Sequence, residues 1–313
     1  MIVRKSESSD KSAMIDLLKL SLGEGILKKS EQVWNYKHEQ NPFGASYVLL
    51  GFEETVLIGI RAFMQWRWQK GEQIWTAYRA VDTATHPNHQ GKGIFKKLTL
   101  QALDDVAQKS ECFIFNTPNE KSRPGYLKMG WEIIEAIPIA IVPVPFYAIS
   151  NLFSQKLEVE HIISPSRLDE ICTFHNNRLS KKNGIFTPKS AAYLKWRYED
   201  NPMQDYTVFS NDDWYLALYC KKHRFFNELR IGDIISANPS LDCRLIRKTI
   251  MQFAFKNKCL IVTVADKSLF GLRFFGKFGP KLTFKPLTKD TVFIKSAMDI
   301  KNWNYNLGDL ELF

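Results

Sequence analysis

Short sequence patterns recur in the same order in the two halves of this chain, and this repetition limits the possible folds more than any other feature. The offset between paired patterns is roughly 150–160 residues, as expected for a duplicated structural unit. The pairs are Trp34-Asn35-Tyr36 with Trp196-Arg197-Tyr198, Asn41-Pro42 with Asn201-Pro202, Val81-Asp82 with Gly232-Asp233, Ile94–Lys109 with Leu241–Lys256, Cys112–Asn116 with Cys259–Val264, and Tyr126–Gly130 with Phe275–Gly279. The order predicts two tandem domains, residues 1–150 and residues 151–313, with the boundary near residues 145–165. A length of 313 residues agrees with two domains.

Helical and extended patterns alternate along the first half. Apolar residues at helical spacing predict helices at residues 10–29 and from Ile94 to about Lys109, and a short helix over residues 122–129. Segments rich in apolar and β-branched residues predict strands, and turn residues bound them. These strands are residues 47–52, 55–62, 74–85, 112–116 and 131–144. The alternation predicts an α/β layer rather than an all-β barrel.

The charge balance favours an anionic partner. Lys and Arg number 43 against 33 Asp and Glu, which gives a formal net charge of +10. Such a charge suits phosphates, nucleic acid or acidic polymers, and it does not choose among them. The five cysteines are odd in number and form no C-x-x-C pair, which argues against a disulfide framework or a structural zinc site. No metal is expected, because His86 and His89 lack a third candidate ligand.

The sequence predicts no membrane span and a cytoplasmic location. The N-terminal residues lack the apolar core of a secretory signal. The longest apolar run, Ala136–Phe153, contains three prolines, which fit a membrane helix poorly. We interpret this run as strands and a connector between domains.

The residues from Thr83 to Phe95 carry the most specific functional pattern. A predicted strand ends, the turn Gln90-Gly91-Lys92-Gly93 follows, and a helix begins. Glycines allow several backbone N–H groups to point into one concavity, and a helix N-terminus adds positive potential. Lys92, Lys96 and Lys97 add charge. The pattern therefore predicts a cradle for a pyrophosphate.

The run from Val81 to Phe95 resembles the acetyl-CoA-binding motif of the GNAT-superfamily N-acetyltransferases, Gln/Arg-x-x-Gly-x-Gly/Ala after a strand. Gln90 and Gly93 match this motif, and Phe95 replaces its final small residue. A second feature of the family follows at Asn116, Asn119, Ser122, Tyr126 and Gly130-Trp131. The stretch 34–44 resembles a bacterial subgroup with two tandem GNAT-like domains. The resemblance implies an α/β (α+β) fold in which each domain is a mixed, mostly antiparallel twisted sheet flanked by helices.

The resemblance also implies a role for each matched residue. The backbone of Thr83, Ala84 and Thr85 would bond the pantetheine arm of acetyl-CoA, the expected co-substrate. The N–H groups of Gln90, Gly91, Lys92, Gly93, Ile94 and Phe95 would hold its pyrophosphate, and Asn116 and Ser122 would complete the coenzyme-binding set. Asn119 would contact the coenzyme or order its thiol end. Tyr126 would act as the general acid, because a phenol can protonate a departing thiolate without carrying permanent charge.

The general base remains open. Asp82, Glu24 and a water relay are candidates. The equivalent Asp233 occurs in the second half, where the glycine turn is absent, and this favours a structural role for both aspartates. Family members often carry an acidic residue earlier in the same strand, and this chain has Arg79 there.

The second half lacks the features that carry chemistry in the first. No Gly-x-Gly occurs between Asn238 and Arg247, and Phe275 is expected at the position of Tyr126. We therefore expect residues 1–150 to bind acetyl-CoA and catalyse, and residues 151–313 to be a degenerate, non-catalytic GNAT-like domain. A second, altered ligand site is the weaker alternative.

The resulting prediction is an acyl-CoA-dependent N-acetyltransferase that moves an acetyl group to the amine of a small molecule or peptide by direct attack. One alternative is a non-catalytic basic and aromatic module that binds nucleic acid or an acidic polymer. Another is an aminoacyl-tRNA-dependent transferase that acts on cell-wall precursors. The Gln90–Gly93 turn favours CoA over both. The aromatic cluster around Trp66 and Trp68 fits core packing better than an acceptor pocket. The acceptor and the oligomeric state stay open.

Overall fold

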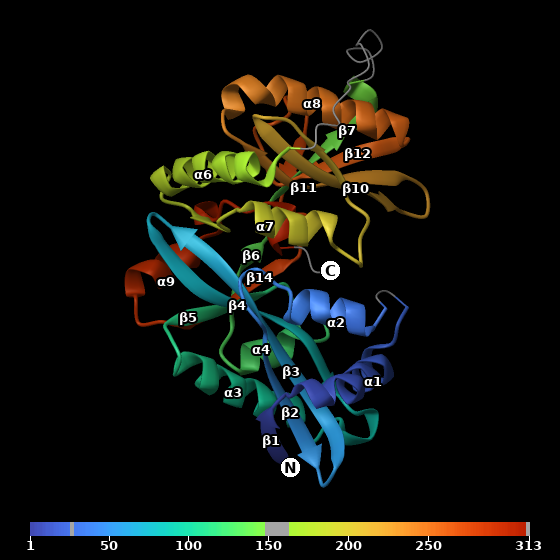
Figure 1. Cartoon of the computed structure of the whole chain (residues 1–313), viewed down its shortest axis with the longest axis vertical. Helices are drawn as coiled ribbons and strands as arrows, with labels where there is room; N and C mark the ends of the chain where they lie inside the picture. The colour runs from blue at the N-terminus through green and yellow to red at the C-terminus, as the bar shows by residue number, and fades with distance from the viewer. Residues whose placement is uncertain (26–27, 148–162, 311–313) are drawn as a thin grey trace. The chain divides into compact units, whose positions relative to one another are not determined.

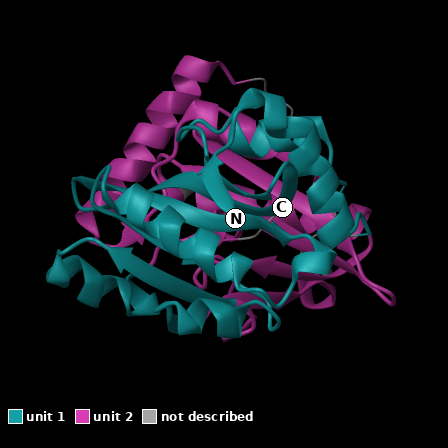
Figure 2. Ribbon diagram, turned by 90° about the horizontal axis from the view of Figure 1, so that it is seen from below, with its two compact units in different colours: residues 1–135, 281–302, 313 teal, residues 136–280, 303–312 magenta. Residues whose placement is uncertain are grey.

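The computed structural model describes residues 1–25, 28–147 and 163–310. They form two compact units, residues 1–135 with 281–302 and residues 136–280 with 303–312 (Figure 2). The predicted boundary between residues 150 and 151 lies outside the described residues. The assignment of catalytic and non-catalytic domains to residues 1–150 and 151–313 stays a prediction.

The first unit is built on one mixed sheet (Figure 1). Its strands, in order across the sheet, are β1 (Ile2–Lys5), β2 (Tyr47–Glu53), β3 (Val56–Lys70), β4 (Gln73–Thr85), β5 (Cys112–Asn116), β14 (Lys281–Leu287) and β6 (Glu132–Ala136). The β4–β5 pair is parallel, and the pairs β1–β2, β2–β3, β3–β4 and β5–β14 are antiparallel.

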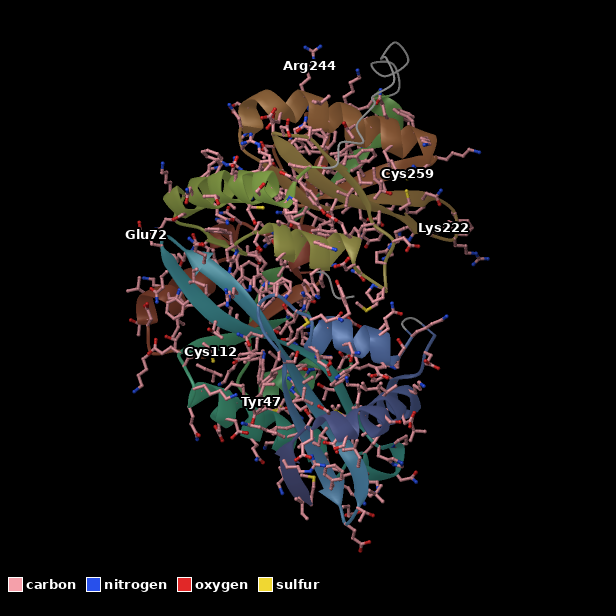
Figure 3. The ribbon with its side chains drawn as sticks, viewed as in Figure 1. Tyr47, Glu72, Cys112, Lys222, Arg244 and Cys259 are labelled. Atoms are coloured by element: carbon pink, nitrogen blue, oxygen red, sulfur yellow. The ribbon has the colours of Figure 1, made fainter. Side chains whose placement is uncertain are left out.

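Helices cover this sheet. They are α1 (Lys11–Leu22), α2 (Glu31–His38), α3 (Ile94–Ala107), α4 (Arg123–Lys128) and α9 (Thr291–Ala297). The apolar stripe of α3 is buried in one cluster with residues of β2, β3, β4 and α4. Tyr47, labelled in Figure 3, ties β2 to α3 because its hydroxyl donates to Asp105. The helix predicted at residues 10–29 ends earlier, at Leu22, because Gly23 adopts a φ of 68° and ends it.

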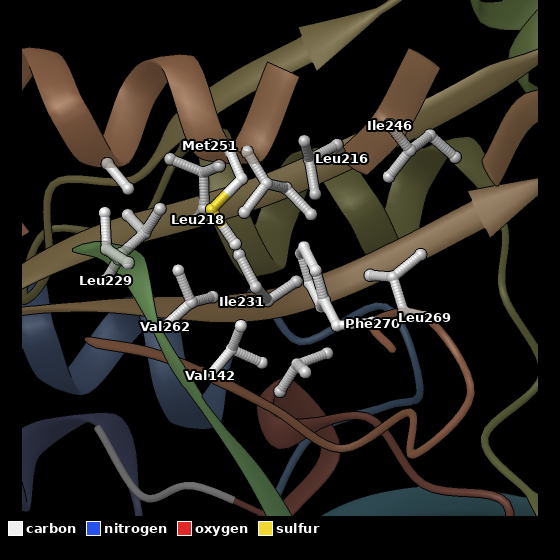
Figure 4. Close-up of a cluster of buried hydrophobic side chains, with 14 of the residues drawn as sticks. Val142, Leu216, Leu218, Leu229, Ile231, Ile246, Met251, Val262, Leu269 and Phe270 are labelled. Carbon is white, nitrogen blue, oxygen red and sulfur yellow. The ribbon is translucent and has the colours of Figure 1, made fainter. Parts of the chain in front are cut away.

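The second unit repeats the plan. Its sheet runs β9 (Thr207–Ser210), β10 (Trp214–Lys222), β11 (Asn227–Ser236), β12 (Cys259–Val264), β7 (Ile139–Pro143) and β13 (Phe274–Gly276), with β11–β12 parallel. Its helices are α6 (Pro165–Lys181), α7 (Ala191–Leu194), α8 (Pro239–Lys256) and α10 (Leu307–Leu310), and β8 is Ile185–Phe186. Ile246 and Met251 of α8 pack against Leu218, Ile231 and Val262 of the sheet (Figure 4).

The strand order and directions in the two sheets confirm the predicted α/β fold with two mixed, GNAT-like sheets. In each, an antiparallel hairpin (β3–β4 or β10–β11) lies beside a parallel strand (β5 or β12), and a helix (α3 or α8) connects the two. The last strand of each half joins the other sheet. β7 follows β6 in the chain and lies between β12 and β13, and β14 follows β13 and lies between β5 and β6. Each compact unit therefore combines segments from both halves of the sequence.

The pairing of Tyr126–Gly130 with Phe275–Gly279 is wrong. Tyr126 lies in helix α4, which begins with a proline in its first turn, whereas Phe275 lies in strand β13 opposite Ala140 of β7. Both halves have an aromatic residue four positions before a glycine, but this residue is helical in the first half and lies in a strand in the second. Phe275 is not the structural counterpart of Tyr126.

The aromatic residues before the glycine turn form core. Trp66 and Trp68 of β3 are fully buried and pack edge-on against Phe115 of β5. This confirms the packing interpretation of the aromatic cluster. Among the described residues, no helix combines the length and apolarity needed to cross a membrane.

Candidate functional site

Strands β4 and β5 part in the middle of the first sheet. Their parallel pairing covers Thr76–Arg79 and Cys112–Phe115 and then stops, although β4 continues to Thr85. In the described part of the chain no strand pairs with residues 80–85 on the β5 side. This edge of β4 can therefore bond an extended ligand as a neighbouring strand would.

A bulge interrupts β4 beside this open edge. Ile60 opposes Ala84 and Ala62 opposes Val81, so Arg61 of β3 faces both Asp82 and Thr83. Asp82 has a backbone φ of 40°, a value that residues other than glycine rarely adopt. Bulges of this kind redirect side chains next to functional sites.

The turn before α3 is open. Gly91 and Gly93 have φ values of 78° and 76°, and a Cβ atom at either position would meet no atom within 4 Å. Gly93 is the N-cap of α3, and no side chain caps the helix there. The N–H groups of the first helical turn therefore have no acceptor within the helix. The exposed Lys92, Lys96 and Lys97 surround this end of α3 with positive charge.

A cavity of about 230 Å³ adjoins the turn. Its lining includes His89, Lys92, Gly93 and Lys97 together with Glu53, which lies 3.3 Å from His89. The N-terminus of α3 and the two lysines make this surface suitable for an anion.

Tyr126 lies on α4 with its ring buried. Asn119 lies in the turn before this helix, where its Oδ1 accepts from the backbone N–H of the N-cap residue Ser122 at 2.9 Å. The Tyr126 ring contacts Phe95 and Trp131 edge-on, with ring centroids 5.5 Å and 5.1 Å apart. Its hydroxyl oxygen accepts a hydrogen bond of 2.9 Å from Nη1 of Arg61.

Arg61 is a functional candidate that the sequence interpretation missed. Its Nη1 also donates to Oγ1 of Thr83 at 2.5 Å, and the whole side chain is buried. The guanidinium carbon lies 4.5 Å, 5.8 Å and 5.3 Å from the ring centroids of Phe63, Phe95 and Tyr126. A basic residue inside the apolar run Leu57–Met64 was the feature that could have drawn attention to it.

The structure brings only some of the predicted residues together. Thr83, Phe95 and Tyr126 meet around Arg61. The backbone carbonyl of Thr85 already accepts a hydrogen bond from Oγ of Ser21. The buried Asn116 bonds through Oδ1 to Thr283 of β14 at 2.6 Å.

The remaining predicted residues divide between the turn and α4. Ala84 is buried in β4, and Gln90–Ile94 form the glycine turn and the start of α3. Asn119 and Ser122 bond to each other at the start of α4. In the described structure Asn119 therefore stabilises the turn before α4, and its role toward the coenzyme stays a prediction.

Asp82 is held by α2. Its Oδ2 accepts from the Lys37 ammonium, and it lies 2.8 Å from Nε2 of His38. Burial alone would raise the pKa of the Asp82 carboxyl, but the Lys37 charge and the His38 hydrogen bond outweigh burial and hold this pKa well below its ordinary value. A carboxylate that binds protons so weakly is a poor general base, so the geometry favours a structural role.

Glu24 is the other candidate base. Glu24 is exposed, and its Oε1 accepts from the backbone N–H of Lys29 at 3.2 Å. The general base stays unassigned.

The helix start in the second unit differs from that of α3. The first turn of α8 contains Asp242, a buried carboxylate that accepts from Oγ of Ser236 at 2.6 Å. Pro239 occupies the first turn, and no glycine precedes it between β11 and α8. A phosphate at this helix end would meet a negative charge rather than free N–H groups.

Comparisons with known proteins agree with this geometry. Residues 2–134 match the family model of the acetyltransferase (GNAT) domain. The structure resembles a GCN5-related N-acetyltransferase from Anabaena variabilis, with a TM-score of 0.64 and 12% identity over 92% of this chain and 73% of that one. Eis1 from Mycobacterium abscessus gives a TM-score of 0.59 and 13% identity over 96% and 76% of the two chains.

A GCN5-related N-acetyltransferase from Kribbella flavida gives a TM-score of 0.65 and 9% identity over 91% and 72% of the chains. Identities this low relate the folds alone. No curated protein matches the sequence. The fold and the open strand edge define an α/β protein with two GNAT-like sheets. Residues 2–134 carry its acetyltransferase (GNAT) domain.

Proposed function

We propose that this protein is an N-acetyltransferase that takes an acetyl group from acetyl-CoA and transfers it to a primary or secondary amine of a small molecule or peptide. The observation that carries the proposal is the convergence of Thr83, Phe95 and Tyr126 on one buried guanidinium. These residues come from the open edge of β4, the first turn of α3 and helix α4.

The residues present fit the extended shape and the charge of acetyl-CoA. The free backbone edge at residues 80–85 suits the amide groups of a pantetheine arm. The uncapped start of α3, with open space at Gly91 and Gly93, suits a pyrophosphate. Lys92, Lys96 and Lys97 supply charge of the opposite sign at that end.

Acetyl-CoA supplies a thioester whose carbonyl carbon accepts the amine nitrogen. Tyr126 would donate its phenolic proton to the departing sulfur, because its hydroxyl oxygen already accepts a bond from Arg61 and its hydrogen is left to point elsewhere. The buried rings of Tyr126 and Trp131 exclude water from one side of the phenol. No residue is assigned to remove a proton from the amine.

We assign this chemistry to the first unit alone. The uncapped glycine turn occurs at α3, whereas the first turn of α8 carries the buried Asp242 carboxylate. The second half of the sequence would then contribute the strand β14, which completes the first sheet.

Two measurements test the proposal. Isothermal titration of the full chain with acetyl-CoA should give saturable binding, and desulfo-CoA should bind similarly because it retains the pyrophosphate. Thiol release from acetyl-CoA should then rise with at least one amine in a panel of amino acids, polyamines, amino sugars and short peptides. Absence of binding at millimolar acetyl-CoA would refute the proposal. Binding that weakens steeply with salt and is outcompeted by single-stranded RNA would support the nucleic-acid alternative instead.

A further inference from the structure

Arg61 is a buried cation for which the described residues supply no anionic partner. No ion pair joins it to a carboxylate in the described parts of the chain, and its side chain has no exposed surface. Its Nε and Nη2 atoms are buried and make no hydrogen bond, so only Nη1 is used. A buried charge in this state is unfavourable unless other groups stabilise it.

The groups around Arg61 stabilise a positive charge only weakly. The Thr83 and Tyr126 hydroxyls accept from Nη1, and the three neighbouring rings offer their π faces or edges at 4.5–5.8 Å. All of these groups are neutral. A negative charge that formed on one of them would therefore interact strongly with the guanidinium, because both groups are buried and already in contact.

The geometry points to Arg61 as the positioning residue of the general acid: it holds the phenol oxygen of Tyr126 and stabilises the phenolate that forms when Tyr126 gives up its proton. This inference rests on the proposed N-acetyltransferase function. The same nitrogen holds Thr83 at the open edge of β4, so one side chain links the proposed pantetheine-binding strand to the proposed acid.

The proton and electron balance of the step defines what Arg61 does. The amine nitrogen bonds to the carbonyl carbon, and the C–S bond breaks with its electron pair on sulfur. The phenolic proton of Tyr126 passes to that sulfur and leaves a phenolate, whose oxygen keeps the bond from Nη1 of Arg61. Water then returns a proton to the phenolate, and the amide product loses its extra proton to water.

A double-mutant cycle tests this inference with the full chain. Arg61→Met removes the guanidinium and keeps an unbranched apolar chain that ends near the former Nε. The buried charge is lost and no new polar group is buried, so the protein should fold and retain its affinity for acetyl-CoA. With saturating acceptor, kcat for thiol release should fall by about 10²-fold, the usual effect of losing one donor to a developing anion. KM for acetyl-CoA should change much less than kcat, because the backbone N–H groups of the glycine turn, which would hold the pyrophosphate, make no bond to Arg61 among the described residues.

Repeating Arg61→Met in the Tyr126→Phe variant distinguishes a positioning role of Arg61 from a purely structural one. Once the phenol is absent, Arg61→Met should change kcat by less than about 2-fold, since the two residues act as one unit. Arg61→Lys retains the charge, should fold even if Arg61→Met does not, and should recover part of the lost rate. Equal losses of rate from Arg61→Met with and without Tyr126 would overturn the inference, as would an unchanged kcat in Arg61→Met.

The outcomes also distinguish this inference from the proposed function. An unmodified chain that neither binds acetyl-CoA nor releases thiol refutes both. An active unmodified chain with an additive double-mutant cycle refutes the role of Arg61 alone.

Discussion

Phe95 contacts Tyr126 edge-on, with ring centroids 5.5 Å apart, and joins the first turn of α3 to helix α4. A Cβ atom on Gly125 would lie 3.0 Å from the Phe95 ring, so the glycine beside Tyr126 makes room for this contact. The aromatic residue at the final position of the glycine motif therefore packs against the proposed acid. It leaves the space around Gly91 and Gly93 open.

Tyr126→Phe should lower kcat for acetyl transfer by about 10²–10⁴-fold, the range for loss of a general acid. Acetyl-CoA affinity should change little, because the ring contacts to Phe95 and Trp131 remain. Steady-state thiol release and isothermal titration measure the two effects. The matched control is Tyr47→Phe, which removes a hydroxyl that donates to Asp105 on α3 and lies outside the site. Wild-type turnover by the Tyr126 variant would exclude the acid role.

Gly93→Ala should weaken acetyl-CoA binding while the protein remains folded. The residue has a φ of 76°, where a Cβ costs about 1 kcal/mol, and relief of that strain would move the N–H groups of the proposed pyrophosphate cradle. Gly71→Ala is the control, since Gly71 has a φ of 57° in the β3–β4 turn and also faces open space. Thermal unfolding should show similar losses in both variants, and titration should show weaker binding only in Gly93→Ala. Equal affinities in the two variants would contradict the cradle.

Local patterns predicted most elements of the first unit. The strand Cys112–Asn116 has the bounds expected, and the buried stripe Ile94, Leu98, Ala102 and Val106 lies on α3 as predicted. These features depend on spacing within one segment, which the sequence records directly. The glycine turn is equally local, since positive φ values at Gly91 and Gly93 follow from residue type.

Features that depend on distant segments could not be predicted in this way. The exchange of β7 and β14 between the sheets depends on which strand edge each segment meets after the chain has folded, and both have ordinary strand patterns. The proposed role of Arg61 depends on its contacts with the β4 bulge and with α4, which lies more than 60 residues later in the sequence. The Tyr126–Phe275 pairing failed for the related reason that a short pattern does not determine whether a segment is helix or strand.

The lysines at the start of α3 should control the salt dependence of acetyl-CoA binding. Lys97→Glu places a negative charge on the wall of the cavity beside Gly93, and affinity should fall by about 10-fold at low salt, with a smaller difference at 1 M salt, where charges are screened over about 3 Å. Lys222→Glu at the end of β10, labelled in Figure 3, makes the same change of net charge away from α3. It should leave the affinity unchanged. Equal effects of the two variants would assign the salt dependence to net charge rather than to this cavity.

The bond between Lys37 and Asp82 should make a pH-dependent contribution to stability. Because the pKa of the Asp82 carboxyl is lowered in the folded protein, its contribution is fully present above the unfolded value of about 3.9 and is lost as pH falls below it. Lys37→Met removes the ammonium and should cost about 3 kcal/mol at neutral pH, since a largely buried carboxylate then loses the cation that it contacts directly. Without Lys37, less opposes the effect of burial, and the pKa of Asp82 rises relative to that in the wild type. Acidification then neutralises the carboxyl at a higher pH in the variant and narrows the difference in stability between variant and wild type.

Thermal unfolding from pH 7 to pH 3 measures this difference. Lys195→Met is the control, because it breaks the solvent-exposed pair with Asp200 and should have a much smaller effect. A gap between Lys37→Met and wild type that stays constant across this pH range would show that Asp82 is not held ionised by Lys37, and would return Asp82 to the candidates for the general base.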